Sequence, residues 1–205
     1  TEVAVNSALE LSKTGHKTAI ADMDIVNPFF RTADARERLE SIGIKVITPP
    51  FANTNADVPA LPAELSALFE DREYRTVLDV GGDDLGAKAL SRYKEEIESN
   101  DWDMFFVVNT KRPMTDTVEK IEEMIDSIEQ SARLSVTGLV NNTNLLSQTS
   151  PEDLVEGYEL LQRVSEKKGI PIVFTSALKE VVFALSGKIN TEFLILDRII
   201  RLPWE

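Results

Sequence analysis

Two short apolar segments that end in acidic residues limit the fold of this chain more than any other feature of its sequence. The segment at 18–22 leads into Asp22 and Asp24, and the segment at 76–80 contains Asp79. Short apolar runs of this kind, bounded by turn residues, are typical of buried strands. The carboxyl ends of parallel strands meet at the edge where open α/β sheets bind ligands. We therefore predict a ligand site that carries these three carboxylates.

Helical segments alternate with strands along most of the chain. The spacing of apolar residues predicts helices at 1–13, 34–41, 63–69, 85–99, 116–132, 150–168 and 177–185. Strands are predicted at 18–22, 44–48, 76–80, 104–109, 135–141 and 170–175. This alternation favours right-handed crossovers between parallel strands. We predict a doubly wound, mostly parallel α/β sheet with helices on both faces, in a single domain spanning residues 1–205.

Several local signals refine this scheme. Residues 49–62 are rich in proline and asparagine and are predicted to form an irregular loop. Asp116 with Glu119 predicts a capping box, and Ser150, followed by proline, predicts a helix start. The C-terminal segment at 190–205 has apolar residues at helical spacing, and we expect it to pack on the domain.

Composition and charge exclude several classes of function. The formal net charge is −13, which argues against non-specific binding to nucleic acid or anionic lipid. The absence of cysteine excludes disulfides, thiol catalysis and zinc–thiolate sites. The single histidine, His16, lies in a turn and is expected to be solvated. No apolar run is long enough to span a membrane and no signal peptide is visible, so we expect a cytoplasmic protein.

The three carboxylates are candidates for magnesium chemistry. Mg²⁺ keeps several waters and takes carboxylate and phosphate oxygens as its other ligands. Asp79 closes an apolar strand, as does the Walker B acid that holds magnesium in nucleotide hydrolases. Gly81 and Gly82 follow it, and glycine lets the backbone come close to a phosphate. The alternative is that such acids cap helices or face solvent.

The first helix begins at Thr1 with no strand before it, although the rest of the chain alternates strand and helix. A magnesium–nucleotide site requires the order G-x-x-x-x-G-K-[ST] followed by a helix. The chain opens with TEVAVNSALEL, which is what a helix after such a loop would look like. We therefore expect a first strand and a phosphate-binding loop to precede the given sequence.

Three segments together resemble the MinD/ParA/Mrp-type ATPases, the deviant Walker A branch of the P-loop ATPases. The segment TEVAVNSALELSKTGHKTAIADMD resembles the part of those proteins that follows the phosphate-loop lysine and ends in D-x-D. The segment DVGG resembles their Walker B segment, D-x-P-x-G, with glycine replacing the proline. The segment GLVNNTN resembles the strand after which an asparagine reads adenine. The resemblance covers most of residues 1–175 and implies the P-loop NTPase fold.

The resemblance implies a role for Thr1 and for each of the three acids. Thr1 corresponds to the loop threonine whose hydroxyl binds magnesium, and Asp79 to the Walker B acid. Asp24 corresponds to the residue that positions the attacking water, and Asp22 would lie near the water shell of the metal.

The resemblance also implies the cofactors and partners. Asn142 corresponds to the asparagine that reads adenine, with Asn141 as the near alternative, since an amide offers both a donor and an acceptor to one base edge. Gly81 and Gly82 would lie near the phosphates. The expected cofactors are ATP and Mg²⁺, and the expected function is hydrolysis that switches a nucleotide-dependent homodimer and its binding of a protein partner.

The sequence departs from the family in two places. It contains no glycine-rich loop and no phosphate-loop lysine, and Thr175, Ser176 and Ala177 stand where the family often has Ile-Pro-x-Asp. Two alternatives therefore stay open. One is a non-enzymatic, phospho-receiver-like signalling domain, in which Thr110 and Lys111 would join the three acids. The other is a nucleotide-free scaffold of the same fold.

Overall fold

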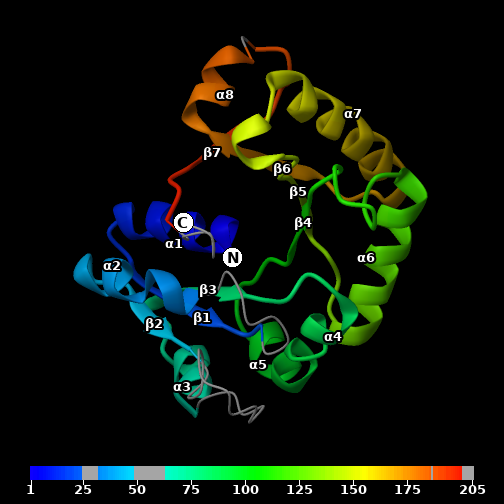
Figure 1. Ribbon diagram of the computed structural model, residues 1–205. Coiled ribbons are helices and arrows are strands. Elements are labelled where there is room, and N and C mark those ends of the chain that lie inside the picture. Colours follow the sequence, from blue (N-terminus) through cyan, green and yellow to red (C-terminus); the bar gives the residue numbers. More distant parts are fainter. Residues whose placement is uncertain (25–31, 49–62, 186, 200–205) are drawn as a thin grey trace. The chain divides into compact units, whose positions relative to one another are not determined.

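The computed structural model describes residues 1–24, 32–48, 63–185 and 187–199. The chain divides into two compact units, each described by itself below (Figure 1). The first unit comprises Thr1–Gly81, Leu85–Asp101 and Arg198–Glu205. The second comprises Gly82–Asp84 and Trp102–Asp197. The expected single domain over residues 1–205 stays a prediction.

The first unit is built on a parallel sheet with the strand order β2-β1-β3. Its helices and strands are α1 (Glu2–Lys13), β1 (Lys17–Asp22), η1 (Thr32–Ala35), α2 (Arg36–Ser41), β2 (Lys45–Ile47), α3 (Ala63–Glu70), β3 (Tyr74–Asp79), most of α4 (Asp84–Ala87), η2 (Leu90–Tyr93) and α5 (Lys94–Glu98). Helix α1 packs against β1 and β3, and α2 packs against β2, so helices flank this sheet.

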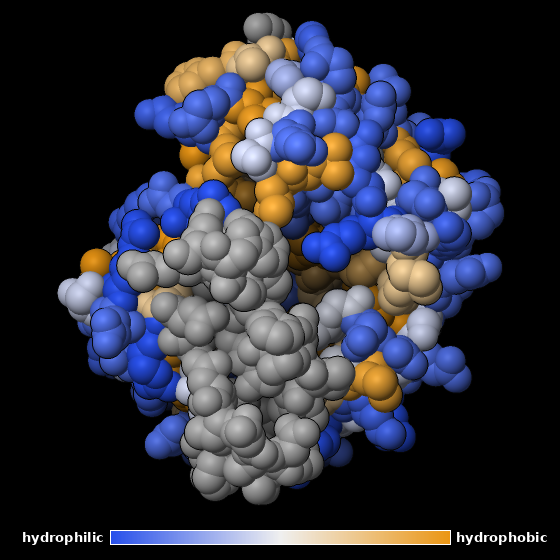
Figure 2. All heavy atoms as spheres, viewed as in Figure 1, coloured by the Kyte–Doolittle hydropathy of each residue, from blue (hydrophilic) through white to orange (hydrophobic). Residues whose placement is uncertain are grey.

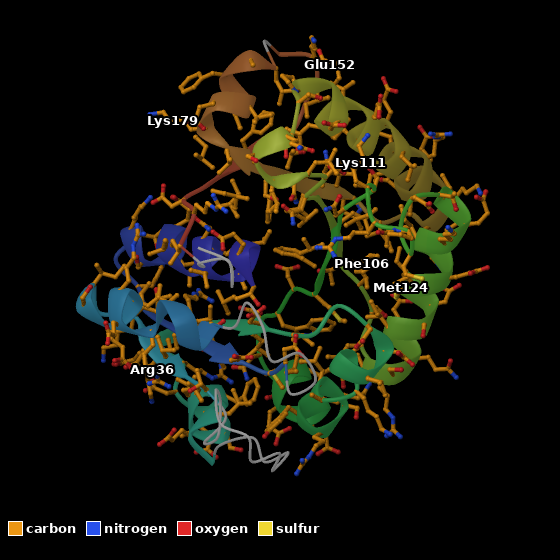
Figure 3. The ribbon with its side chains drawn as sticks, viewed as in Figure 1. Arg36, Phe106, Lys111, Met124, Glu152 and Lys179 are labelled. Carbon is orange, nitrogen blue, oxygen red and sulfur yellow. The ribbon has the colours of Figure 1, made fainter. Side chains whose placement is uncertain are left out.

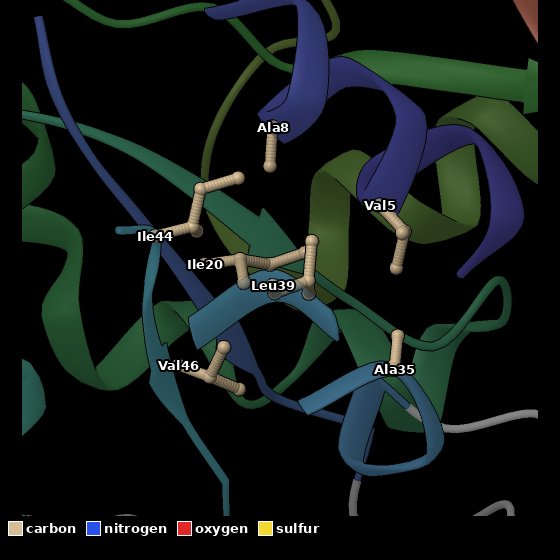
Figure 4. Close-up of a cluster of buried hydrophobic side chains, with 7 residues drawn as sticks. All are labelled: Val5, Ala8, Ile20, Ala35, Leu39, Ile44 and Val46. Atoms are coloured by element: carbon tan, nitrogen blue, oxygen red, sulfur yellow. The ribbon is translucent and has the colours of Figure 1, made fainter. Parts of the chain in front are cut away.

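One apolar cluster joins α1 and α2 to the sheet (Figure 4). Its buried members are Val5, Ala8, Ile20, Ala35, Leu39, Ile44 and Val46. Ile20 and Leu39 are fully buried, and truncating a buried Leu or Ile to Ala typically costs about 2–5 kcal/mol. This packing fixes the direction of β1 and therefore the position of the acids at its carboxyl end.

The second unit is built on a parallel sheet with the strand order β4-β5-β6-β7. Its helices and strands are β4 (Phe105–Val108), α6 (Val118–Ala132), β5 (Gly138–Asn141), η3 (Leu146–Gln148), α7 (Pro151–Lys168), β6 (Ile172–Leu178), α8 (Lys179–Ala184) and β7 (Glu192–Leu196). Helices α6 and α7 pack side by side, and α7 covers β5 and β6 (Figure 1). Phe106 of β4 and Met124 of α6 are labelled in Figure 3.

The predicted α/β class with parallel strands and flanking helices is confirmed. The sequence predicts one sheet, whereas the described strands form two. Among the described residues β3 bonds only to β1 and β4 only to β5, so each of these strands is the edge of its own sheet. The strand expected before Thr1 is not part of the sequence and stays a prediction.

Two predicted elements near the sheet edges are wrong in detail. The helix predicted at 85–99 is divided into α4, η2 and α5. Helix α4 ends at Ala87, and η2 begins at Leu90 after a two-residue turn. The capping box predicted at Asp116 is also wrong, because α6 is capped by Thr117, whose hydroxyl accepts from the Lys120 N–H. Asp116 instead forms an ion pair with Lys120.

The C-terminal part departs further from the prediction. Strand β6 runs on to Leu178, so α8 starts two residues later than predicted, and the tail forms β7 instead of a helix. Leu194 of β7 is buried beside Ser176 of β6. Short apolar runs fit both periods, and here pairing with the open edge of β6 decides for the strand. The predicted helix start at Ser150 is confirmed, with a full capping box to Asp153.

Hydrophilic residues cover most of the described surface that faces the viewer in Figure 2, with smaller hydrophobic patches between them. None of the helices in the described ranges is long and apolar enough to cross a membrane. The loop predicted at 49–62 and the end of the tail at 200–205 lie outside the described residues.

Candidate functional site

The structure places Asp22 and Asp79 side by side at the carboxyl edge of the first sheet. They are paired in register as the last residues of β1 and β3, and both are buried, with 1% and 4% of their surface exposed. The Met23 N–H donates to the Asp79 carbonyl over 2.8 Å, which extends the ladder by one residue. The predicted meeting of these two acids is therefore confirmed by the strand register.

The Asp79 carboxylate faces the start of α1. Its Oδ1 lies 3.2 Å from the main-chain nitrogen of Thr1. Thr1 is the N-cap residue of α1, but its hydroxyl does not cap the helix. The predicted metal-binding residues Thr1 and Asp79 are thus neighbours, and the Thr1 hydroxyl is not committed to its own helix.

Sequence reasoning missed Thr32. Its side chain is fully buried, and its hydroxyl donates to Asp79 Oδ2 over 2.8 Å. Thr32 opens η1, and no motif in the sequence marks it, because its partner is 47 residues away. Asp79 Oδ2 therefore has a buried hydrogen-bond donor of its own, which holds that oxygen in place.

Asp24 lies just beyond β1, next to the glycines that follow β3. Its N–H donates to Asp22 Oδ1 over 3.1 Å. A methyl group at Gly81 would lie 3.2 Å from Asp24 Oδ1 and 3.0 Å from the Cα of Gly86, so only glycine fits there without displacing a neighbour. Gly82, which is exposed, would meet nothing within 4 Å. Of the two predicted glycines, Gly81 is the one at which a side chain would meet an acid of the site.

The donor set fits a magnesium ion that keeps its waters. Carboxylate and hydroxyl oxygens are the ligands this hard cation prefers. Within the described ranges, however, no group of three or more His, Cys, Asp or Glu side chains is arranged to hold a metal. The protein ligands alone therefore do not form a closed cage, and an ion here would need water and ligand oxygens to complete its shell.

The two candidate base-reading residues lie at the end of β5 in the second unit: Asn141 is its last residue, and Asn142 follows it. Asn141 is completely buried. Its Nδ2 donates to the Leu154 carbonyl over 3.0 Å, and its Oδ1 accepts from the Thr143 N–H over 3.2 Å. Asn142 is half-buried, and its Oδ1 accepts from the Ser176 hydroxyl over 2.9 Å. Both polar atoms of the Asn141 side chain are thus bonded within the unit, whereas Asn142 keeps part of its surface exposed.

The residues proposed for a phospho-receiver are engaged within the second unit. The Thr110 hydroxyl is 3.1 Å from the Thr143 hydroxyl. Lys111, labelled in Figure 3, forms ion pairs of 2.8 Å with Asp153 and 2.9 Å with Glu156. Both carboxylates belong to the first two turns of α7, so Lys111 anchors the end of β4 to that helix.

These contacts shift two pKa values. The pKa of Asp153 is lowered to about 2, mainly by the hydrogen bond from Lys111 and then by the N–H and hydroxyl of Ser150. The pKa of Lys111 is raised, first by Asp153 and then by Glu156. Both groups are therefore charged at neutral pH and stabilise the start of α7.

Comparison with known proteins identifies no family. No protein-family model matches the chain, and no curated protein matches it. Among solved structures it is similar to two crystal structures of FtsY from Mycoplasma mycoides, with TM-scores of 0.49 and 0.47. In both cases the identity is 15%, and the match covers 85% of this chain and 55% of the other. A nucleotide-binding protein in complex with ADP from Archaeoglobus fulgidus matches with a TM-score of 0.43 and 15% identity, over 90% of this chain and 78% of that one.

Proposed function

We propose that the protein is a magnesium-dependent nucleotide-binding switch that binds and hydrolyses ATP, of the MinD/ParA/Mrp type. The observation that carries the proposal is the pair of buried acids, Asp22 and Asp79, at the carboxyl edge of a parallel sheet beside Thr1, the N-cap residue of α1. Ligands bind at that edge in open α/β sheets, and helix N-termini favour anions. The proposal rests on these residues of the chain and not on the similarity to solved structures.

The roles in this proposal follow from position. Thr1 and Asp79 would hold Mg²⁺, which neutralises phosphate charge when it is bound, and Asp22 would accept hydrogen bonds from its waters. Asp24, at the edge of the sheet beside Gly81, would orient the attacking water. The glycine at position 81 would let the backbone approach the terminal phosphate.

Asn142 would read the base in this proposal. It is half-buried and follows β5 directly, whereas both the nitrogen and the oxygen of the Asn141 side chain already form hydrogen bonds. ATP is preferred to GTP on this assignment. Nucleotide-dependent homodimerisation, a protein partner and a cytoplasmic location belong to the same proposal. Thr110 and Lys111, which the phospho-receiver alternative would use, are engaged by residues of their own unit, so we favour the nucleotide switch.

The roles of Asp24 and Asp79 can be separated by experiment in the full-length protein. A group that acts only on the attacking water contributes chiefly in the transition state. Asp24→Ala should therefore keep Mg²⁺–ATP affinity while lowering turnover by about 10- to 1000-fold. Asp79→Ala should weaken Mg²⁺-dependent binding itself.

Asp101→Ala is the matched control, because Asp101 is an exposed acid of the same unit. It removes the same charge and should leave both binding and turnover unchanged. Hydrolysis by Asp24→Ala at the parent rate would refute the assignment of the water-positioning group. Unchanged Mg²⁺–ATP binding by Asp79→Ala would refute the metal site.

A further inference from the structure

The hydroxyl of Thr32 and the carboxylate of Asp79 form a hydrogen bond inside the first unit. The two oxygens are 2.8 Å apart, and both residues are buried. An ionised carboxylate has no hydrogen to donate, so the Thr32 hydroxyl is the donor in this pair. Because both groups are shielded from bulk water, removing the hydroxyl would leave a buried carboxylate oxygen without this donor.

The two oxygens of the Asp79 carboxylate face different parts of the first unit. Oδ2 faces Thr32, which opens η1, whereas Oδ1 lies 3.2 Å from the main-chain nitrogen of Thr1. A half-turn of the carboxylate exchanges two equivalent oxygens and leaves this arrangement unchanged, but a smaller rotation weakens the bond to Thr32. The hydrogen bond therefore restrains the plane of the carboxylate, and one oxygen stays turned toward Thr1.

Thr32 is itself held by the packing that fixes β1. Ala35 at the end of η1 and Leu39 of α2 are buried in the same apolar cluster as Ile20 of β1 (Figure 4). The short helix η1 also contacts β1 directly. In addition, a β-branched side chain such as threonine is restricted at its first torsion. The donor therefore reaches Asp79 from a rigid support, which is what a preorganised site requires.

We propose that Thr32 is a positioning residue of the metal site, which holds the Asp79 carboxylate in the orientation that serves Mg²⁺. This inference rests on the proposed function, in which Asp79 holds the metal. It goes further by giving a role in that site to a residue that no sequence motif marks. Hydrogen-bond partners of the groups that hold a metal orient those groups, and removing such a partner typically lowers metal affinity by about 10- to 100-fold.

Two substitutions separate the hydroxyl of Thr32 from the rest of its side chain. Thr32→Val keeps the shape and removes the donor, whereas Thr32→Ser keeps the donor and removes the methyl group. Thr18→Val is the matched control. Thr18 is also buried in the first unit, but it lies near the start of β1, where its hydroxyl donates to the His16 carbonyl over 3.2 Å. The control therefore removes a buried hydroxyl at the end of the strand opposite to Asp22.

The measurement is the affinity of the full-length protein for a non-hydrolysable ATP analogue, with Mg²⁺ and with the metal chelated. The ratio of the two affinities gives the contribution of the metal independently of turnover. We expect Thr32→Val to lower this ratio by about tenfold or more, while its affinity without metal stays within about twofold of the parent. Thr32→Ser and Thr18→Val should both keep the ratio within about twofold of the parent value.

A further variant keeps the test decisive if Thr32→Val does not fold. Thr32→Ala also removes the hydroxyl, but it leaves room for a water molecule and places no methyl group against the Asp79 carboxylate. A water can replace the lost donor, yet it is held less firmly than a hydroxyl carried by η1. The ratio of the two affinities should therefore still fall by about threefold or more in Thr32→Ala.

The outcomes separate this inference from the proposed function. A parental ratio in Thr32→Val or Thr32→Ala, or an equal loss in Thr32→Ser, would overturn the role of Thr32 while leaving the metal site in place. An equal loss in Thr18→Val would also overturn it, because any weakening of the unit would then have the same effect. If the parent binds no nucleotide, or binds it equally well without Mg²⁺, the proposed function fails and this inference fails with it.

Discussion

Replacing Gly86 by alanine tests the close approach that places Gly81 next to Asp24. A methyl group at Gly86 would lie 2.5 Å from the Gly81 Cα and 2.7 Å from both its carbonyl carbon and its oxygen. All three are backbone atoms, which cannot rotate away as the end of a side chain can. The substitution must therefore displace the segment that follows Asp79.

Two opposing effects determine how far Gly86→Ala changes the free energy of unfolding. Gly86 lies within α4, and alanine is favoured over glycine in a helix interior by about 1 kcal/mol. Overpacking of a tight contact costs about 1–3 kcal/mol. Because the contact is with backbone at less than 3 Å, we expect the steric cost to prevail. The free energy of unfolding should fall by about 1–2 kcal/mol.

The assay is urea unfolding, followed by ATP turnover of the full-length protein. Turnover should fall by about 10- to 100-fold, because small displacements of positioned groups cost this much in rate. Gly82→Ala is the matched control, since a methyl group there meets nothing within 4 Å. It should be neutral or slightly stabilising. A Gly86→Ala protein as stable as Gly82→Ala would refute the close approach of Gly81 and Gly86.

Two further predictions concern groups that the site depends on. The pKa of Asp153 is about 2 in the folded protein and about 3.9 in the unfolded chain. The ionised carboxylate therefore stabilises the folded state by about 1–3 kcal/mol above pH 4, and this stabilisation is lost as the pH falls toward 2. In urea unfolding, Asp153→Ala should therefore lower the free energy of unfolding at pH 7 but not near pH 2. Glu156→Ala removes the more exposed partner of Lys111 and should change the free energy of unfolding by less than about 1 kcal/mol at either pH. Thr32→Val keeps the shape of the side chain but removes the donor to Asp79, and it should lower the free energy of unfolding by about 1–3 kcal/mol in the same assay. Thr32→Ser keeps the donor and should stay close to the parent. Equal stability of the two variants would show that the hydrogen bond contributes nothing.

The sequence predicted the part of the site that depends on strand register. Asp22 and Asp79 could be placed together because each closes an apolar run, and parallel strands bring such ends to one edge. The same local reasoning predicted the cap of α7, because Ser150, proline and Asp153 act within one helical turn.

Contacts between distant residues escaped prediction. Thr32 meets Asp79 across a long sequence separation, and Ser176 meets Asn142 between two strands. No local pattern encodes either contact. The tail was misread for a related reason, since a short apolar run fits a helix or a strand and the available edge of β6 decides between them. The proposal of Asn142 over Asn141 likewise required their burial, because the two amides are adjacent at the end of β5.

The most direct test of the account is the binding of ATP and GTP to the full-length protein by titration calorimetry, with Mg²⁺ and with the metal chelated. We predict that ATP binds with Mg²⁺, that chelation weakens this binding by about tenfold or more, and that GTP binds more weakly than ATP. Failure to bind ATP at millimolar concentration in the presence of Mg²⁺ would contradict the proposed nucleotide site. Binding that is indifferent to Mg²⁺ would contradict the role given to Asp79.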